Sequence, residues 1–117
     1  MFTYEDALVE IQKQVAGGFN SLNFTEFKLA ELDNEIADIN FQLCKANAET
    51  DAYWRGAKDT TIGKTLTETA ISAKIDLDPK VLKLKKQLLE AKAERRIYQA
   101  FNTVEEREFK VKLSGKQ

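Results

Sequence analysis

The sequence contains no histidine, one cysteine and one proline. Without histidine, neither a histidine-activated Ser or Cys nucleophile nor a Cys/His metal cluster can form. The single cysteine, Cys44, cannot form an intramolecular disulfide, and an unpaired thiol is typical of a protein in a reducing cytosol. These absences predict a cytoplasmic protein that is not an enzyme and that holds no metal or cofactor.

Residues that interrupt helices are also scarce, since the 117 residues contain only five glycines and one proline. Apolar residues make up 43% of the chain and charged residues 32%. This composition favours long amphipathic helices in one domain over a sandwich or barrel. The first residues are acidic and contain no long apolar run, so neither a signal peptide nor a membrane span is expected.

The strongest periodicity lies between residues 29 and 53, where apolar residues alternate at spacings of three and four, with Thr50 the one polar exception. This pattern predicts a long helix over 25–55 with a narrow apolar seam and a charged back. Asn23 or Thr25 is the expected N-cap, and Gly56 the expected stop. The predicted seam consists of Leu29, Leu32, Ile36, Ile39, Leu43, Ala46, Thr50 and Tyr53.

Residues 1–24 predict a short helix followed by a loop. Thr3 with Asp6 resembles a capping box, and Gly17-Gly18 should end the helix. Four large apolar residues follow within nine positions, and leaving them in water would cost about 1.5–3 kcal/mol each. We expect them to plug the end of the bundle or to form a docking patch. They are Phe19, Leu22, Phe24 and Phe27.

The second half predicts a polar loop over 57–64, a short helix over 65–77 and a long helix over 78–113. Thr65 with Glu68 resembles a second capping box, although alternating apolar residues over 71–77 leave a β-hairpin as the alternative. Asp78 is a strong N-cap, followed by Pro79 at the first helical position. The predicted seam of the last helix consists of Val81, Leu84, Leu88 and Ala91, then Ile97 or Tyr98, Phe101 and Val104, widened by Leu82 and Leu89.

These elements together predict an all-α fold: a long helical hairpin, or coiled-coil-like bundle, with a short middle helix, as a single domain over 1–117. The seams are more extensive than a hairpin of this length should cover alone. We therefore expect a homo-oligomer larger than a dimer. The residues expected to make its contacts are Leu29, Leu32, Ile36, Ile39, Leu43, Leu84, Leu88 and Phe101.

The net charge of −1 conceals an uneven distribution. Residues 1–53 hold three lysines against ten Asp and Glu, a net −7, whereas residues 54–117 hold fifteen Lys and Arg against nine Asp and Glu, a net +6. Either the halves pair within the hairpin or between subunits, or the basic half forms a surface for polyanions. Composition alone favours pairing.

Two short motifs bear on ligand binding. Gly63-Lys64-Thr65 resembles the end of a phosphate-binding loop, but Lys58 stands where that motif requires its first glycine, so no nucleotide site is expected. Tyr53, Trp54 and Arg55 join Lys58 and Lys64 in a cluster whose aromatic rings could stack on unpaired bases while the cations hold phosphates. The alternative places Tyr53 at the end of the seam and packs Trp54 against the last helix, and the residues alone favour it.

Four motifs follow one another between residues 48 and 113: Tyr-Trp-Arg-Gly at 53–56, Thr-Glu at 67–68, Asp-x-x-Val-Leu-Lys-Leu at 78–84 and Arg-x-Phe-x-Val-Lys at 107–112. Their order resembles the UvsY-type recombination mediators of T-even phages and their relatives. That family has a Tyr-Tyr-Ser-Gly-type stretch at the first motif, so Trp and Arg are substitutions here. The residues before Phe27 match the family poorly.

The resemblance implies a ring-like homo-oligomer that binds single-stranded DNA and helps to load a RecA-like recombinase onto strands covered by single-strand-binding protein, in the host cytoplasm if the chain is phage-encoded. The family's Lys-x-Arg before the tyrosines is absent, since Ala48, Glu49 and Thr50 occupy those positions. Other residues must then contact DNA. The expected ones are Tyr53, Trp54, Arg55, Lys58, Lys64, Lys80, Lys83 and Lys86.

A different class of function remains open. The chain could be a non-enzymatic coiled-coil adaptor or a prefoldin-like chaperone or assembly factor that binds only protein. That function predicts a β-hairpin near residues 57–77, exposed apolar tips and no affinity for DNA.

Overall fold

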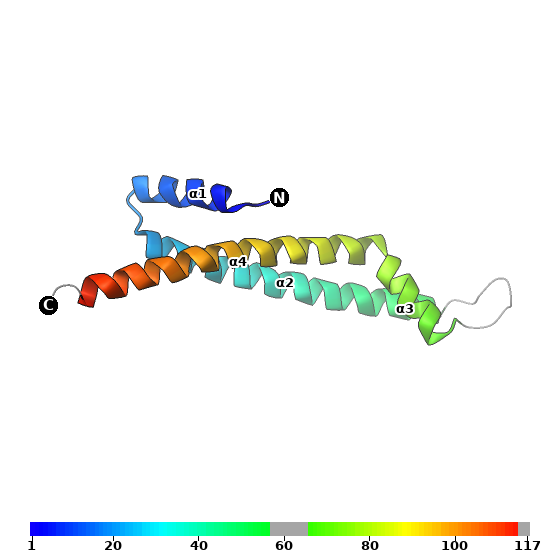
Figure 1. The fold of residues 1–117 in the computed structure, drawn as a ribbon. Coiled ribbons are helices and arrows are strands. Elements are labelled where there is room, and N and C mark those ends of the chain that lie inside the picture. The colour runs from blue at the N-terminus through cyan, green and yellow to red at the C-terminus, as the bar shows by residue number, and fades with distance from the viewer. Residues whose placement is uncertain (57–65, 115–117) are drawn as a thin grey trace. The chain divides into compact units, whose positions relative to one another are not determined.

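The computed structural model describes residues 1–56 and 66–114, so the expected loop with Lys58 and Lys64 lies outside the described residues, as does Thr65. The described residues form four helices and no strand: α1 (Tyr4–Ala16), α2 (Ser21–Arg55), α3 (Glu68–Leu77) and α4 (Pro79–Ser114) (Figure 1). The all-α prediction is confirmed. A β-hairpin near residues 57–77 was the alternative prediction. In the described part of that segment, Glu68–Leu77 form the helix α3 instead.

The described residues pack as two compact units. The first unit contains α1, the part of α2 up to Ile36 and the part of α4 from Glu90 onward. The second contains α2 from Ala37, the whole of α3 and α4 up to Leu89. Within the described ranges, no helix is both long and apolar enough to cross a lipid bilayer.

The start of α1 is confirmed as a capping box. The Thr3 hydroxyl accepts the backbone N–H of Asp6 at 3.2 Å, and the Asp6 carboxylate accepts the backbone N–H of Thr3 at 2.9 Å. The two side chains thus satisfy two N–H groups that a helix start otherwise leaves unpaired. The helix ends at Ala16, and Gly18 follows with φ of 100°, a conformation that favours glycine.

The start of α2 differs from the prediction. Asn20 caps the helix, because its side-chain oxygen accepts the backbone N–H groups of Leu22 at 2.9 Å and Asn23 at 3.3 Å. The expected start near residue 25, with Asn23 or Thr25 as the cap, is therefore wrong. The cluster of apolar residues had suggested a loop, but it contains a helix start, and only Phe19 precedes α2.

The core of the first unit forms around Tyr98 of α4, which is 1% exposed. Its ring meets Phe24 of α2 edge-to-face with a centroid distance of 6.2 Å, and Phe2 at 5.5 Å. Of the four apolar residues expected to plug the bundle, Phe24 is fully buried, whereas Phe19 and Phe27 are exposed. The buried cluster consists of Ala7, Ile11, Phe24, Leu32 and Tyr98.

One buried polar pair lies in the same unit. Thr25 of α2 is 0% exposed and Asn102 of α4 is 3% exposed. The Asn102 amide donates a hydrogen bond to the Thr25 hydroxyl at 3.0 Å, and that hydroxyl donates to the Leu22 carbonyl at 2.9 Å. Any axial shift between α2 and α4 would leave these groups without partners, so the pair sets their register in this unit.

The second unit packs α2, α3 and α4 around a smaller apolar core. Thr67, and not Thr65, caps α3 by accepting the backbone N–H of Ala70 at 3.1 Å, so the predicted capping box is corrected by two residues. Asp78 caps α4 as predicted, with its carboxylate accepting the N–H groups of Lys80 and Val81. The buried residues of this core are Ile39, Ala46, Ile71, Val81 and Leu84.

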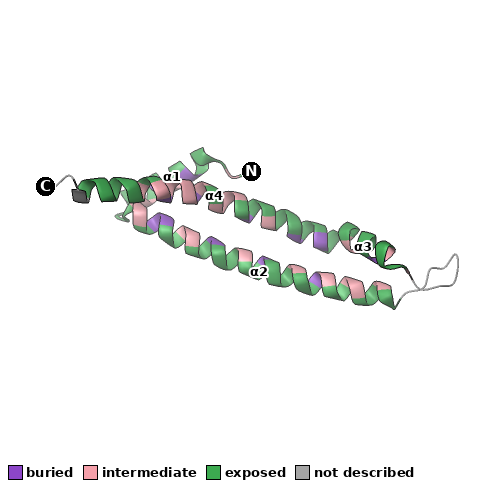
Figure 2. Cartoon of the chain, turned by 60° about the horizontal axis from the view of Figure 1, so that its bottom comes forward, coloured by how far each residue is buried: buried purple, intermediate pink, exposed green. Residues whose placement is uncertain are grey.

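Buried and half-buried residues recur along the sides of α2 and α4 that face each other (Figure 2). Most residues of both predicted seams are therefore buried or half-buried within one chain. The oligomeric state itself stays a prediction. Of the residues expected to make subunit contacts, Leu32, Ile39 and Leu84 are buried and Leu29, Ile36, Leu43, Leu88 and Phe101 are half-buried. Tyr53, Leu82, Leu89 and Val104, also expected in the seams, are exposed.

Candidate functional site

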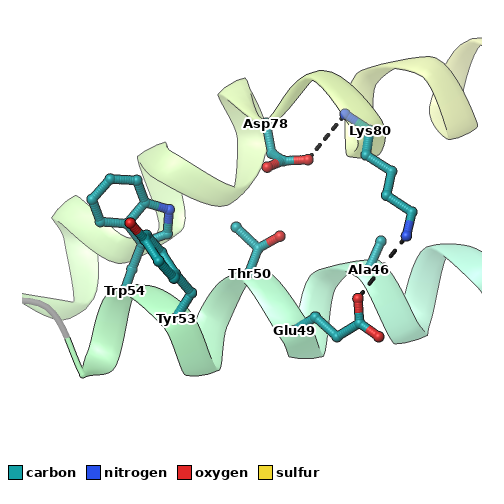
Figure 3. Close-up of a pocket in the computed structure, with 7 residues that line it drawn as sticks. All are labelled: Ala46, Glu49, Thr50, Tyr53, Trp54, Asp78 and Lys80. Atoms are coloured by element: carbon teal, nitrogen blue, oxygen red, sulfur yellow. Dashed lines mark hydrogen bonds and ion pairs between the residues drawn. The ribbon is translucent and has the colours of Figure 1, made fainter.

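The two aromatic residues of the predicted cluster lie at the C-terminal end of α2, in the second unit. The rings of Tyr53 and Trp54 meet edge-to-face, with centroids 5.0 Å apart and planes at 89° (Figure 3). Trp54 is half-buried, but 69% of the Tyr53 surface is exposed. The structure thus leaves the Tyr53 ring open to solvent and braces it against Trp54.

Trp54 also has a cationic neighbour that sequence reasoning missed. The ammonium of Lys74 on α3 lies 4.8 Å from the centroid of the Trp54 ring, within the range of a cation–π interaction. Lys74 follows the buried Ile71 by three residues, which places both on neighbouring positions of one helical face. In the sequence, only the spacing from Ile71 indicated that Lys74 lies on the side of α3 that packs against the rest of the unit. The contact with Trp54 could not be read from the sequence, because Trp54 lies on a different helix.

A groove with a cavity volume of about 320 Å³ runs between the end of α2 and the start of α4 (Figure 3). We call it the Tyr53 groove. The carboxylate of Glu49 lies 4.0 Å from the ammonium of Lys80, and Asp78 is occupied in capping α4. The lining as a whole is therefore not positive. It consists of Ala46, Glu49, Thr50, Tyr53, Trp54, Asp78 and Lys80.

Arg55 is engaged by two carboxylates. Its guanidinium donates two hydrogen bonds to Glu68 of α3, one of them at 2.9 Å, and its Nε lies 2.8 Å from Asp51. The hydrogen bonds from Arg55 hold the pKa of Glu68 below its usual value, and both carboxylates raise the pKa of Arg55. In this structure the Arg55 side chain therefore links α3 to α2, and the expectation that Arg55 contacts DNA stays a prediction.

Replacing Glu68 by glutamine should loosen α3 without unfolding the chain. The charge-assisted bonds to Arg55 are lost, but the pair is solvent-exposed and Ile71 still anchors the helix. Hydrogen–deuterium exchange of 68–77 should accelerate, while exchange in the first unit stays unchanged. Because the Glu68 pKa is lowered in the fold, wild-type α3 should loosen likewise as pH falls through that lowered pKa.

The exposed Lys83 makes no ion pair with a described residue and provides the matched control. Lys83→Ala should leave the exchange of α3 at the wild-type rate. Equal exchange of α3 in Glu68→Gln and wild type would show that the Arg55–Glu68 pair does not hold this helix.

The predicted cations of α4 differ in their surroundings. Lys80 borders the Tyr53 groove beside Glu49, whereas Lys83 and Lys86 are exposed and make no ion pair with any described residue. At about 100° per residue, Lys83 lies about 60° around the helix from Lys80, but Lys86 lies about 120° away. The structure thus brings Tyr53 and Lys80 to one groove, whereas Lys83 lies about one turn further along α4 and Lys86 lies on another side of that helix.

A second groove, of about 230 Å³, lies in the first unit between α1 and the start of α2. Three phenylalanines contribute to it, and two of them, Phe19 and Phe27, are 58% and 63% exposed. The sequence predicted that these residues would plug the end of the bundle or form a docking patch. The groove is lined by Glu10, Gln14, Phe19, Phe24, Phe27 and Lys28.

Comparison with known proteins identifies no relative: no family model, no curated protein and no solved structure matches this chain.

Proposed function

We propose that the protein binds single-stranded DNA without sequence preference and acts as a recombination mediator. It would help a RecA-like recombinase to load onto strands covered by single-strand-binding protein, in the cytoplasm and without a cofactor. The observation that carries the proposal is the exposed Tyr53 ring, braced by Trp54 at the rim of a groove that Lys80 borders. Every unpaired base has a π-face that can stack on such a ring.

Phosphate contacts in this proposal fall to Lys80 and Lys83. Lys83 has no carboxylate partner among the described residues, and Lys80 would exchange its 4.0 Å contact with Glu49 for a phosphate. Since the net charge is −1, attraction must come from such local groups, and each site should bind weakly. Repetition of the site in an oligomer would raise the affinity through effective concentration.

The experiment is fluorescence anisotropy of a labelled single-stranded oligonucleotide at two salt concentrations, with the mass of the complex measured alongside. Tyr53→Ala should weaken binding by about 1–3 kcal/mol. Lys83→Ala should weaken binding to all sequences alike and flatten the salt dependence by about 0.7 in the logarithmic slope. Phe27→Ala, which removes an equally exposed ring in the first unit, is the control and should bind like wild type.

No binding at low salt by the folded wild-type protein would end this proposal. Binding of DNA without any acceleration of recombinase loading onto covered strands would leave a DNA-binding protein that is not a mediator.

The second candidate function is a protein-binding adaptor, and the phenylalanine groove of the first unit favours it. Exposed Phe19 and Phe27 suit an apolar side chain of a partner protein. If the protein is an adaptor, titration with a single-stranded oligonucleotide should show no binding. Phe27→Asp should then abolish binding of the partner protein, whereas Tyr53→Ala should leave that binding intact.

A further inference from the structure

Side chains of the short helix α3 occupy two of the groups that the sequence predicted as DNA contacts. Glu68 accepts two hydrogen bonds from the Arg55 guanidinium. The Lys74 ammonium lies over the Trp54 ring, 4.8 Å from its centroid. Trp54 and Arg55 are the last two residues of α2, whereas both of their partners belong to α3. The protein's own side chains therefore engage the aromatic ring and the cation together.

Both contacts have the chemistry of a nucleic-acid contact. A guanidinium can form the same pair of parallel hydrogen bonds with a carboxylate as with a phosphate, so Glu68 occupies Arg55 as a phosphate of the strand would. Lys74 lies over the face of the Trp54 ring, where an unpaired base would stack. A strand can therefore use these two groups only after the side chains of α3 have left them.

The hold of the second unit on α3 is weak. Within this helix only Ile71 is buried. The ion pairs Arg55–Glu68 and Lys85–Asp76 that tie α3 to α2 and α4 are solvent-exposed, and exposed ion pairs contribute little to stability. A helix with a single buried anchor and exposed ion pairs belongs to the part of a fold that opens locally at low cost.

The contact between α2 and α3 also carries a penalty that release of α3 would remove. A groove of about 270 Å³ lies between the two helices, and Asn47 of α2 is part of its lining. The side-chain oxygen of Asn47 is buried and accepts no hydrogen bond from any described residue. A buried oxygen without a partner is unfavourable, and departure of α3 would open this groove to water. The penalty offsets part of the stabilisation that Ile71 contributes when α3 is docked.

We propose that α3 is an autoinhibitory helix, which must leave the end of α2 before a single strand of DNA can bind Trp54 and Arg55. This regulation rests on the DNA binding proposed above. While α3 is docked, a strand reaches the exposed Tyr53 and the lysines of α4. Release of α3 adds an aromatic face and a cation to that site. The strand therefore binds the released state more tightly and shifts the population toward it.

A variant that releases α3 should bind DNA more tightly than wild type. Ile71→Ala removes the buried anchor without changing any charge. If the released state makes up about a tenth of the wild-type population, the affinity for a labelled single-stranded oligonucleotide should rise about tenfold. Leu77→Ala truncates an apolar residue of the same helix that is 71% exposed, and this control should bind like wild type. An Ile71→Ala variant that keeps its helical circular dichroism but binds no more tightly would overturn the autoinhibition.

Hydrogen–deuterium exchange of the wild-type protein tests the same regulation without a substitution. A saturating single-stranded oligonucleotide should accelerate exchange over 68–77, because binding displaces α3, and should leave exchange in the first unit unchanged. A strand that bound on top of a docked α3 would instead slow this exchange. Slower or unchanged exchange over 68–77 with DNA bound would overturn the autoinhibition and leave the DNA binding itself established.

The effect of Arg55→Ala should depend on whether α3 is docked. In wild type the substitution removes a phosphate contact but also the partner of Glu68, so the loss of affinity is offset by easier release of α3. In Ile71→Ala the helix is already released, and Arg55→Ala should therefore cost more affinity there than in wild type. An equal cost in both backgrounds would contradict the autoinhibition. Absence of binding by wild type and Ile71→Ala alike would refute the proposed DNA binding, and this regulation with it.

Discussion

Ile39→Asp is expected to unfold the second unit. Ile39 is 6% exposed in the core that also contains Val81 and Leu84. A carboxylate at this position has no cationic partner in that core, so it must either stay charged in an apolar environment or take up a proton. Either cost is large beside a total stability of about 5–15 kcal/mol for a protein domain.

Far-UV circular dichroism and thermal melting measure this effect. Ile39→Asp should lose much of its helical signal at room temperature, or melt far below wild type without a cooperative transition. Asn40→Asp adds the same carboxylate one residue further along α2, on an exposed position, and should melt close to wild type. If both variants melt alike, Ile39 does not lie in the core described for this unit.

Tyr98→Ala should be the most damaging truncation in the first unit. Tyr98 is the largest of the fully buried side chains, and it contacts the rings of Phe2 and Phe24. Removing a buried aromatic ring costs about 3–5 kcal/mol, because the lost burial is compounded by the cavity that remains. The urea midpoint should fall accordingly.

The matched control for Tyr98→Ala is Tyr53→Ala, since Tyr53 is the same residue type but 69% exposed. Its free energy of unfolding should lie within about 0.5 kcal/mol of wild type, as is usual for surface substitutions. Equal destabilisation by the two variants would contradict the burial that the structure assigns to them.

Tyr98 should also contribute to loss of stability at high pH. Burial, together with nearby Glu94, raises the pKa of Tyr98 to about 12. In an unfolded chain the pKa of tyrosine is about 10. As pH rises, Tyr98 therefore loses its hydroxyl proton in the unfolded chain before it does so in the folded protein. The stability that Tyr98 contributes below the unfolded-state pKa is then lost as pH rises through the folded-state pKa. Tyr98→Phe keeps the ring and should reduce this alkaline loss in urea titrations.

Local sequence determined where most helices begin and end. The Thr3–Asp6 capping box, the stop at Gly17-Gly18 and the Asp78-Pro79 start were all predicted and confirmed. Each depends on groups within about four residues of one another, so backbone geometry alone brings them together. The predicted start of α2 was wrong because the large apolar residues that follow the Asn20 cap resemble a loop in sequence, whereas Phe24 is buried against Tyr98 of α4, a contact with a residue distant in the chain.

Tertiary structure decided which side of each helix is buried and what each charge contacts. Leu88 and Leu89 are equivalent in hydropathy, yet only Leu89 is exposed, because the direction of α2 and α3 selects one side of α4. Arg55 could have faced a phosphate, but Glu68, brought close by the packing of α3, compensates its charge. The apolar periodicity of the sequence therefore determined that two long helices pair, whereas their packing decided which aromatic, cationic and apolar groups remain exposed, since exposure depends on neighbours that are distant in the chain.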